Sequence, residues 1–192
     1  WNRSFLHLLN IGGNRMSLYL VESVLASLVK DQDSFEKKAA AIQESLSAQG
    51  ATLIEIQVSK DFSRAFFIIE SEERNTINES LRALEVPVSL IKPVRLIGQD
   101  LEKVKQAADV VNYLVEWNLP ENLTMDQYLD RKKTNSVHYA EVPEVAFSRT
   151  YVCEDMTKCL CFYDAPDEST VKKAREAVKA PIDTITEILP QK

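Results

Sequence analysis

The sequence contains few of the residues that enzymes acting on small molecules most often use. Its 192 residues include only four glycines and two histidines. A chain so poor in glycine has little capacity to wrap its backbone closely around a nucleotide phosphate. No Gly-rich phosphate loop, His-Glu-x-x-His, Gly-x-Ser-x-Gly or Cys-x-x-Cys pattern is present. The sequence carries no signature of a familiar catalytic class, and a non-catalytic protein is favoured over an enzyme.

Long apolar runs and a surplus of positive charge are also missing. No apolar run approaches the roughly 20 residues that a membrane-crossing helix needs. The chain has 23 Lys and Arg against 29 Asp and Glu, a net charge of −6, so a phosphate backbone would be repelled overall. The sequence therefore predicts neither a membrane span nor a nucleic-acid partner.

Cysteine is scarce and unevenly placed. The three cysteines, Cys153, Cys159 and Cys161, all lie close together in the second half of the chain. An odd, clustered set is not the framework of a disulfide-stapled secreted domain, and it favours a reducing compartment. A cytoplasmic location is expected.

Residues 1–15 stand apart from the rest of the sequence. The apolar cluster Phe5–Ile11 lacks the basic start, the longer apolar core and the cleavage site of a signal peptide. Met16 is a candidate natural start, which would make residues 1–15 a leader segment. The alternative is a docking peptide whose apolar residues bind a groove on a partner protein.

From residue 16 onwards the chain repeats itself at a fixed spacing. Tyr19–Glu22 recurs as Tyr113–Glu116, and Val58 and Asp61 recur as Val152 and Asp155, all at an offset of 94 positions. Chance matches would not keep one offset over so long a stretch. A tandem repeat is predicted.

Each copy predicts the order strand, helix, strand, strand, helix, strand of a ferredoxin-like α+β domain. The first helices are expected to begin near Asp33, with Glu36 in a capping box, and at Thr124, with Gln127 in the same role. The expected strands are 17–23, 52–58, 64–70 and 88–94, then 111–117, 146–152, 158–164 and 182–188. The predicted division is a tail at 1–15, copy one at 16–94, a helical linker at 95–110 and copy two at 111–192.

The third strand of each copy is apolar at every position. Ala65–Ile69 and Cys159–Tyr163 have no alternation, although neighbouring side chains of a strand point to opposite faces. Both faces must therefore be covered, and helices can cover only one of them. We expect two antiparallel sheets packed face to face as an internal pseudo-dimer, with any ligand cavity between the sheets.

Copy two carries the most distinctive string of the sequence, Cys161 followed by Tyr163–Pro166, between a first strand at Tyr113–Glu116 and an ending at Ile185–Glu187. On these residues it resembles a small bacterial domain-of-unknown-function family with a ferredoxin-like fold that includes nickel-binding members. The resemblance implies a bound divalent transition metal, nickel in particular. It covers most of copy two and reaches copy one only through the repeat.

Two departures from the family pattern point to an altered site. Where the family's second strand carries His, this chain has Arg149 in copy two and Glu55 in copy one. Arginine stays protonated and cannot bind a metal ion. Phe67 replaces Cys161 in copy one, so any chemistry is expected in copy two.

The candidate metal ligands are His138, Cys153, Cys159 and Cys161. Cys159 and Cys161 lie two apart on a predicted strand, hence on one face, roughly 7 Å apart. Thiolate and imidazole groups are suitable ligands for soft and borderline metals. The alternative is that Cys159 and Cys161 are small buried hydrophobic residues and His138 lies at the surface. Cys153, beside a turn, is expected to be the more exposed thiol.

A second candidate site lies between the two predicted sheets. Its residues are Tyr19, Glu22, Tyr113, Glu116 and Arg149. Across a pseudo-twofold axis, Glu22 and Glu116 would approach each other as a paired acidic site. The alternative is that both carboxylates form ion pairs across the sheet with Arg149 or Lys158.

Three functions are left open by the sequence. The first is a non-catalytic metal-binding protein with an altered, nickel-type site in copy two. The second is an enzyme-like or small-molecule-binding dimeric α/β barrel with its ligand between the sheets. The third is a protein-interaction module that uses residues 1–15, and a homo-oligomer is compatible with each.

Overall fold

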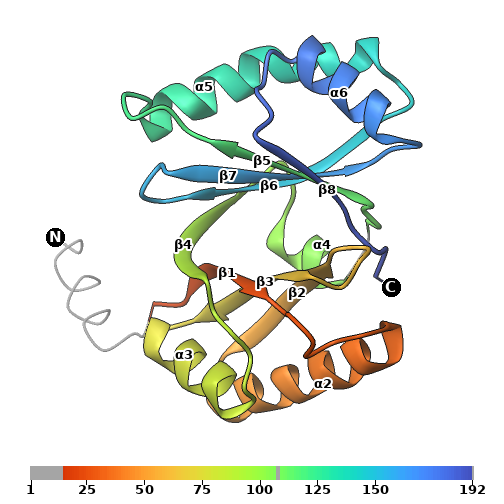
Figure 1. Ribbon diagram of the computed structural model, residues 1–192. Helices are drawn as coiled ribbons and strands as arrows, with labels where there is room; N and C mark the ends of the chain where they lie inside the picture. The colour runs from red at the N-terminus through yellow and green to blue at the C-terminus, as the bar shows by residue number, and fades with distance from the viewer. Residues whose placement is uncertain (1–14, 107–108, 192) are drawn as a thin grey trace, which may run out of the picture.

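The structure, a computed structural model, describes residues 15–106 and 109–191 (Figure 1). The strands are β1 (Ser17–Val24), β2 (Thr52–Val58), β3 (Arg64–Ser71), β4 (Leu90–Ile97), β5 (Tyr113–Asn118), β6 (Ala146–Cys153), β7 (Lys158–Asp164) and β8 (Thr184–Glu187). The helices are α2 (Gln32–Ala48), α3 (Arg74–Ala83), α4 (Leu101–Lys105), α5 (Met125–Asn135) and α6 (Glu168–Ala177), with a 3₁₀ helix η1 (Ser136–Glu141). Residues 1–14 of the predicted tail lie outside the described residues.

The predicted α+β class is confirmed, but the prediction of two separate sheets is wrong. All eight strands form one sheet in the order β2-β3-β1-β4-β6-β7-β5-β8. The two halves are joined because β4 pairs with β6, from Val94 opposite Cys153 to Ile97 opposite Thr150. This pairing extends β4 to Ile97, three residues past its predicted end, and it covers two strand edges that would otherwise be open.

The two ends of the sheet also meet. Ser59, directly after β2, bridges to Ile188, directly after β8. The Lys60 amide donates to the Glu187 carbonyl at 2.9 Å, and the Leu189 amide donates to the Val58 carbonyl at 3.0 Å. The sheet therefore curls into a barrel in which the two halves face each other, with α2 and α3 outside one half and α5 and α6 outside the other (Figure 1).

Side-chain alternation sorts the strand residues into an outer, helix-covered layer and a barrel interior. On β1, Tyr19 and Val21 pack with the helices, whereas Leu20 belongs to the interior cluster. Large side chains such as Phe66 and Phe162 fill the interior, where the sequence predicted a ligand cavity. Continuous apolar strands thus reflect a barrel that buries both faces of its sheet.

Helix capping follows the sequence in one half and departs from it in the other. The Thr124 hydroxyl accepts from the Gln127 amide at 3.2 Å, which confirms the predicted capping box of α5. In α2 the capping residue is Asp31, whose carboxylate accepts from the Ser34 amide at 2.8 Å. The predicted capping pair of Asp33 and Glu36 is wrong by two residues, because Asp31 takes the extended backbone conformation of a cap.

Within the described ranges 15–106 and 109–191, no helix combines the length and apolar character that spanning a membrane requires.

Candidate functional site

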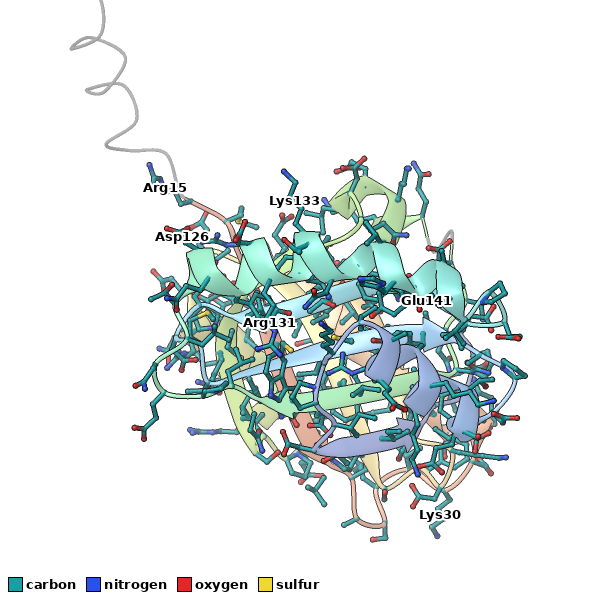
Figure 2. All side chains as sticks on the ribbon, turned by 90° about the horizontal axis from the view of Figure 1, so that it is seen from above. Arg15, Lys30, Asp126, Arg131, Lys133 and Glu141 are labelled. Carbon is teal, nitrogen blue, oxygen red and sulfur yellow. The ribbon has the colours of Figure 1, made fainter. Side chains whose placement is uncertain are left out.

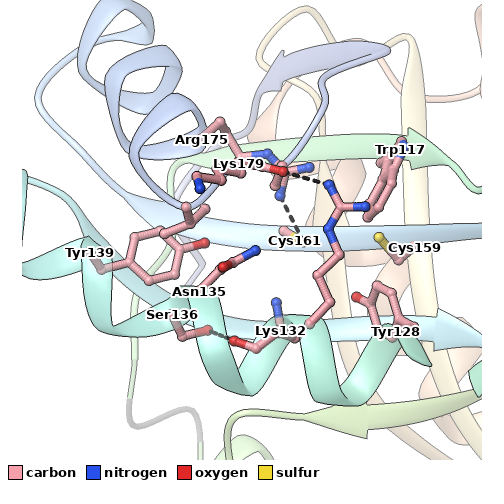
Figure 3. A pocket seen from close by; sticks show the side chains of 13 residues that line it. Trp117, Tyr128, Lys132, Asn135, Ser136, Tyr139, Cys159, Cys161, Arg175 and Lys179 are labelled. Carbon is pink, nitrogen blue, oxygen red and sulfur yellow. Dashed lines mark hydrogen bonds between the residues drawn. The ribbon is translucent and has the colours of Figure 1, made fainter. Parts of the chain in front are cut away.

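A small pocket lies on the outer face of the second half, between the sheet and its covering helices (Figure 3). We call it the α5–α6 pocket, and its cavity volume is about 30 Å³. Its lining comes from β5, β7, α5, η1 and the segment that begins in α6. The lining residues are Trp117, Tyr128, Arg131, Lys132, Asn135, Ser136, Tyr139, Cys159, Cys161, Arg175, Val178, Lys179 and Ala180.

The floor of the α5–α6 pocket depends on two residues that differ between the halves. Cys161 lies opposite Val115 in the strand pairing, as Phe67 lies opposite Val21 in the first half. Arg175 holds the place on α6 that Leu81 holds on α3. Phe67 and Leu81 are buried in the apolar core of the first half. The second half therefore has a thiol and a guanidinium where the first half is filled with apolar side chains.

Arg175 is almost completely enclosed, with 2% of its surface exposed. Its Nη1 donates to the Cys161 sulfur at 3.3 Å and to the Tyr163 hydroxyl at 3.2 Å, and its Nη2 donates to the Pro181 carbonyl. Its Nε is buried and has no hydrogen-bond partner among the described residues. Figure 3 shows the side chain reaching from α6 toward Cys161 at the floor of the pocket.

The pKa values of the two thiols in the pocket are shifted in opposite directions. A hydrogen bond from Cys159, with Lys132 and Arg175 nearby, holds the pKa of Cys161 well below its usual range despite burial. The same hydrogen bond, together with burial, raises the pKa of Cys159. The Thr150 hydroxyl also donates to the Cys161 sulfur, at 3.1 Å.

The rim of the pocket is cationic and aromatic. Arg131 donates to the Lys179 carbonyl at 2.8 Å and lies over the Trp117 ring at 5.4 Å. Figure 2 shows Arg131 on the side of α5 that faces α6, with Lys133 on the opposite side. Burial raises the pKa of Tyr128, so this phenol stays neutral at physiological pH. None of the described residues that line the pocket is acidic.

The four predicted metal ligands are not brought together. Cys159 and Cys161 share the pocket, but Cys153 belongs to the barrel interior and is completely buried, so the prediction that it is exposed is wrong. His138 lies on η1 and is exposed, with its Nδ1 2.7 Å from a Glu141 carboxylate oxygen. Across the described part of the chain, no group of three or more His, Cys, Asp or Glu is arranged to hold a metal ion.

The two repeated glutamates of the second predicted site do meet inside the barrel. The Lys158 ammonium is 2.9 Å from Glu22 and 2.8 Å from Glu116. The Arg64 guanidinium is 2.7 Å from Glu22 and 3.1 Å from Glu116. The two carboxylates and the two cations therefore neutralise each other. Lys158 is one of the two ion-pair partners that were predicted from the sequence for these glutamates.

The other three residues of that predicted site do not join this cluster. Arg149 forms a separate buried pair with Glu55, with Nη2–Oε1 and Nε–Oε2 distances of 2.6 and 2.9 Å, and the Tyr151 hydroxyl also donates to Glu55. Tyr19 and Tyr113 belong to the helix-side cores and not to the interior. Their prediction as interior residues is wrong, because a residue three positions from Glu22 or Glu116 points to the opposite face of its strand.

Sequence reasoning missed Arg175, Arg131 and the aromatic walls of the pocket. A signal for Arg175 was present, since a charged residue stands in the apolar stripe of α6 where α3 has Leu81. No comparable signal marks Arg131, because exposed Arg and Lys residues are common along α5. Its place above Trp117 depends on how α5 packs against the sheet.

One known family matches part of the sequence. The family described as "Nickel responsive protein SCO4226-like" matches residues 113–188, which run from the start of β5 through β8. No curated protein matches the chain. The similarity to the predicted family is thus confirmed for the second half only.

One solved structure resembles the whole barrel at low sequence identity, and two further structures align more weakly. The crystal structure named "Putative Chlorite dismutase TA0507" aligns with a TM-score of 0.53 and 14% identity, over 91% of this chain and 94% of that chain. SCO4226 from Streptomyces coelicolor A3(2) aligns with a TM-score of 0.36 and 16% identity, over 42% of this chain and 98% of that chain. An anthrone oxidase-like protein aligns with a TM-score of 0.45 and 11% identity, over 93% of this chain and 92% of that chain. The first of these defines the fold class, a ferredoxin-like α+β barrel.

Proposed function

We propose that the chain is a non-catalytic binding protein whose ligand occupies the α5–α6 pocket. The observation that carries the proposal is the exchange of Phe67 and Leu81 for Cys161 and Arg175 between equivalent places of the two halves. Ligand pockets typically combine apolar and aromatic walls with a few polar groups, and this pocket has both. In this proposal the halves are tandem copies of one ferredoxin-like unit, and the second copy carries the site.

Ligand-dependent thermal unfolding tests the proposal. A panel of small anions, cations and neutral molecules is screened for compounds that raise the melting temperature of the protein, since a ligand at 100 times its Kd stabilises by about 2.7 kcal/mol. Ala180→Leu narrows the rim of the pocket, and Ala140→Leu adds the same volume at an exposed place on η1 that does not line it. A true pocket ligand stabilises the wild type and Ala140→Leu, and not Ala180→Leu. If no compound separates the two variants, the proposal fails.

Nickel binding is the second candidate, favoured by the family match over residues 113–188. Cys159 and Cys161 on one face of β7 would supply two sulfur ligands. This donor set is incomplete, and the Arg175 cation 3.3 Å from Cys161 opposes a second cation beside it. The residues therefore fit a metal poorly, and the site would have to differ from the four ligands predicted from the sequence.

Native mass spectrometry of the reduced protein with Ni²⁺, Zn²⁺ and Co²⁺ decides this candidate. One metal per chain that is lost in Cys159→Ser/Cys161→Ser and kept in Cys153→Ser would support a metal site in the second half. Binding that survives both variants would point to other ligands, His138 among them. The same spectra report the oligomeric state, for which a homo-oligomer stays a prediction, as does a partner-binding role for residues 1–15.

A further inference from the structure

The α5–α6 pocket concentrates positive charge in an acidic protein. Arg131, Lys132, Arg175 and Lys179 all line it, whereas the whole chain has a net charge of −6. The excess is therefore a local property of this pocket. Clustered cations in a partly enclosed site raise the local concentration of anions and the rate at which they associate.

Arg175 at the floor lacks the partner that a buried guanidinium normally has. Arg149, the other buried arginine among the described residues, binds the Glu55 carboxylate through two hydrogen bonds. Arg175 has instead a thiol, a phenol and a backbone carbonyl as acceptors, and in the described part of the chain no carboxylate pairs with it. A buried charge is costly unless it is both paired and hydrogen-bonded.

Arg175 has hydrogen-bonding capacity that is left unfilled. Its Nε donor is buried without a partner, and the side chain is one of the walls of the cavity. A planar guanidinium matches the geometry of carboxylate and phosphate oxygens better than that of any other common ligand group. Among the described lining residues no acid competes for this place.

We propose that the ligand of the α5–α6 pocket is a small oxyanion, carried by a carboxylate or a phosphate group, that binds at the Arg175 guanidinium. This inference rests on the proposed function and names its ligand class. Lys132 on the rim supplies a second positive charge. The rings of Trp117, Tyr128 and Tyr139 form walls that limit the ligand to a small or flat molecule.

Fluorescence of Trp117 gives a direct readout of occupancy. Trp117 lines the pocket and the only other tryptophan is Trp1, so Trp1→Phe leaves one reporter. Acetate, inorganic phosphate and acetamide are titrated at constant ionic strength maintained with potassium chloride. Acetamide has the shape of acetate without its charge. We expect acetate or phosphate to change the emission of Trp117 saturably and acetamide to bind at least tenfold more weakly.

Matched variants assign any binding to the pocket. Arg175→Leu, which copies the Leu81 of the first half, is expected to reduce affinity at least tenfold. Lys132→Gln is expected to weaken binding several-fold, whereas Lys133→Gln, one position along α5 and outside the lining, leaves it unchanged. Arg175→Lys keeps the charge without the planar donor pair, and is expected to bind more weakly than the wild type. Arg175→Lys takes the place of Arg175→Leu in this test if Arg175→Leu does not fold.

Each outcome separates the ligand class from the proposed function. Binding of acetate alone identifies a carboxylate ligand, and binding of phosphate alone identifies a phosphate ligand. Equal binding of acetamide and acetate overturns the oxyanion inference and leaves a ligand pocket in place. Anion binding that is unchanged in both Arg175 variants and in Lys132→Gln overturns it as well. If none of the three probes binds, the inference is wrong, and the thermal screen above decides the proposed function separately.

Discussion

Arg175 is a residue whose burial is expected to lower the stability of the protein. Its charge is desolvated without a carboxylate partner, and the corresponding residue of the first half is the apolar Leu81. Replacing a buried charge with an apolar side chain of similar size often raises stability, by about 1–4 kcal/mol. We therefore expect Arg175→Leu to raise the free energy of unfolding by about 1 kcal/mol at a pH low enough to protonate Cys161, where this thiol no longer pairs with the guanidinium, measured by urea denaturation.

The matched control for that measurement is Arg149→Leu. Arg149 is equally buried, but its removal leaves the Glu55 carboxylate without a cation, so a loss of about 3 kcal/mol or more is expected. If Arg175→Leu raises the free energy of unfolding and Arg149→Leu lowers it, Arg175 is retained for binding and not for stability. A loss in Arg175→Leu as large as that in Arg149→Leu would mean that Arg175 holds the second half together.

Cys161 provides a spectroscopic test of the charge in the pocket. Because its pKa is held well below the usual value of about 8.5, the ultraviolet absorbance of the thiolate should include a step at clearly lower pH. The step should disappear in Cys161→Ser, move to higher pH in Arg175→Leu, and persist in Cys153→Ser, since burial raises the pKa of Cys153. A group with a lowered folded pKa stabilises fully above its unfolded pKa, so this contribution to stability is lost as the pH falls through the folded pKa. A step that persists in Cys161→Ser would assign the thiolate elsewhere.

At the scale of elements, the ion pair of Glu55 and Arg149 joins β2 to β6 across the barrel interior. Both side chains are nearly fully buried, and the two strands lie far apart in the order of the sheet. Breaking such a pair from one side costs about 3–5 kcal/mol, whereas replacing both partners with apolar residues is often neutral. We expect Glu55→Leu to be strongly destabilising and Glu55→Leu/Arg149→Leu to recover most of the loss. Additive losses in this double-mutant cycle would contradict a direct coupling.

Local patterns in the sequence were sufficient to predict most elements but not their pairing. The α5 cap at Thr124 and the third strands were found because capping and burial on both faces leave local signals. The end of β4 at Ile97 was missed, since residues 95–97 are held by pairing with β6, some fifty positions away. Tyr19 was misplaced although strand alternation alone puts it on the face opposite Glu22. The α5–α6 pocket could not be predicted, because its cations converge only after α5 and α6 have packed.

The whole molecule is a closed barrel whose halves are tied together by charge at the centre. Arg64 comes from the first half and Lys158 from the second, and each contacts both Glu22 and Glu116. Each half alone would keep one acid and one base, Glu22 with Arg64 and Glu116 with Lys158, but would lose the two ion pairs that cross between the halves. The network therefore favours one particular alignment of the two halves, which is a common use of buried polar groups.

The same network should make the barrel sensitive to acid. Burial raises the pKa of Glu116, but hydrogen bonds from Arg64 and Lys158 outweigh it and hold the pKa below the usual value. Stabilisation from a carboxylate with a lowered folded pKa is complete above its unfolded pKa, about 4.3, and is lost as the pH falls through the folded pKa. Thermal unfolding should therefore show a loss of stability below about pH 4 that is smaller in Glu116→Gln.

The control for that pH profile is Glu187→Gln, at the seam between β2 and β8. Glu187 pairs with Lys60 at 3.2 Å, but both side chains are exposed, so its removal should cost less than about 1 kcal/mol and leave the acid profile unchanged. Glu116→Gln should cost about 3 kcal/mol at neutral pH, because Arg64 and Lys158 then share one buried carboxylate. If the two variants behave alike, the acid sensitivity arises at the surface. If only Glu116→Gln changes the profile, the interior network holds the two halves in register.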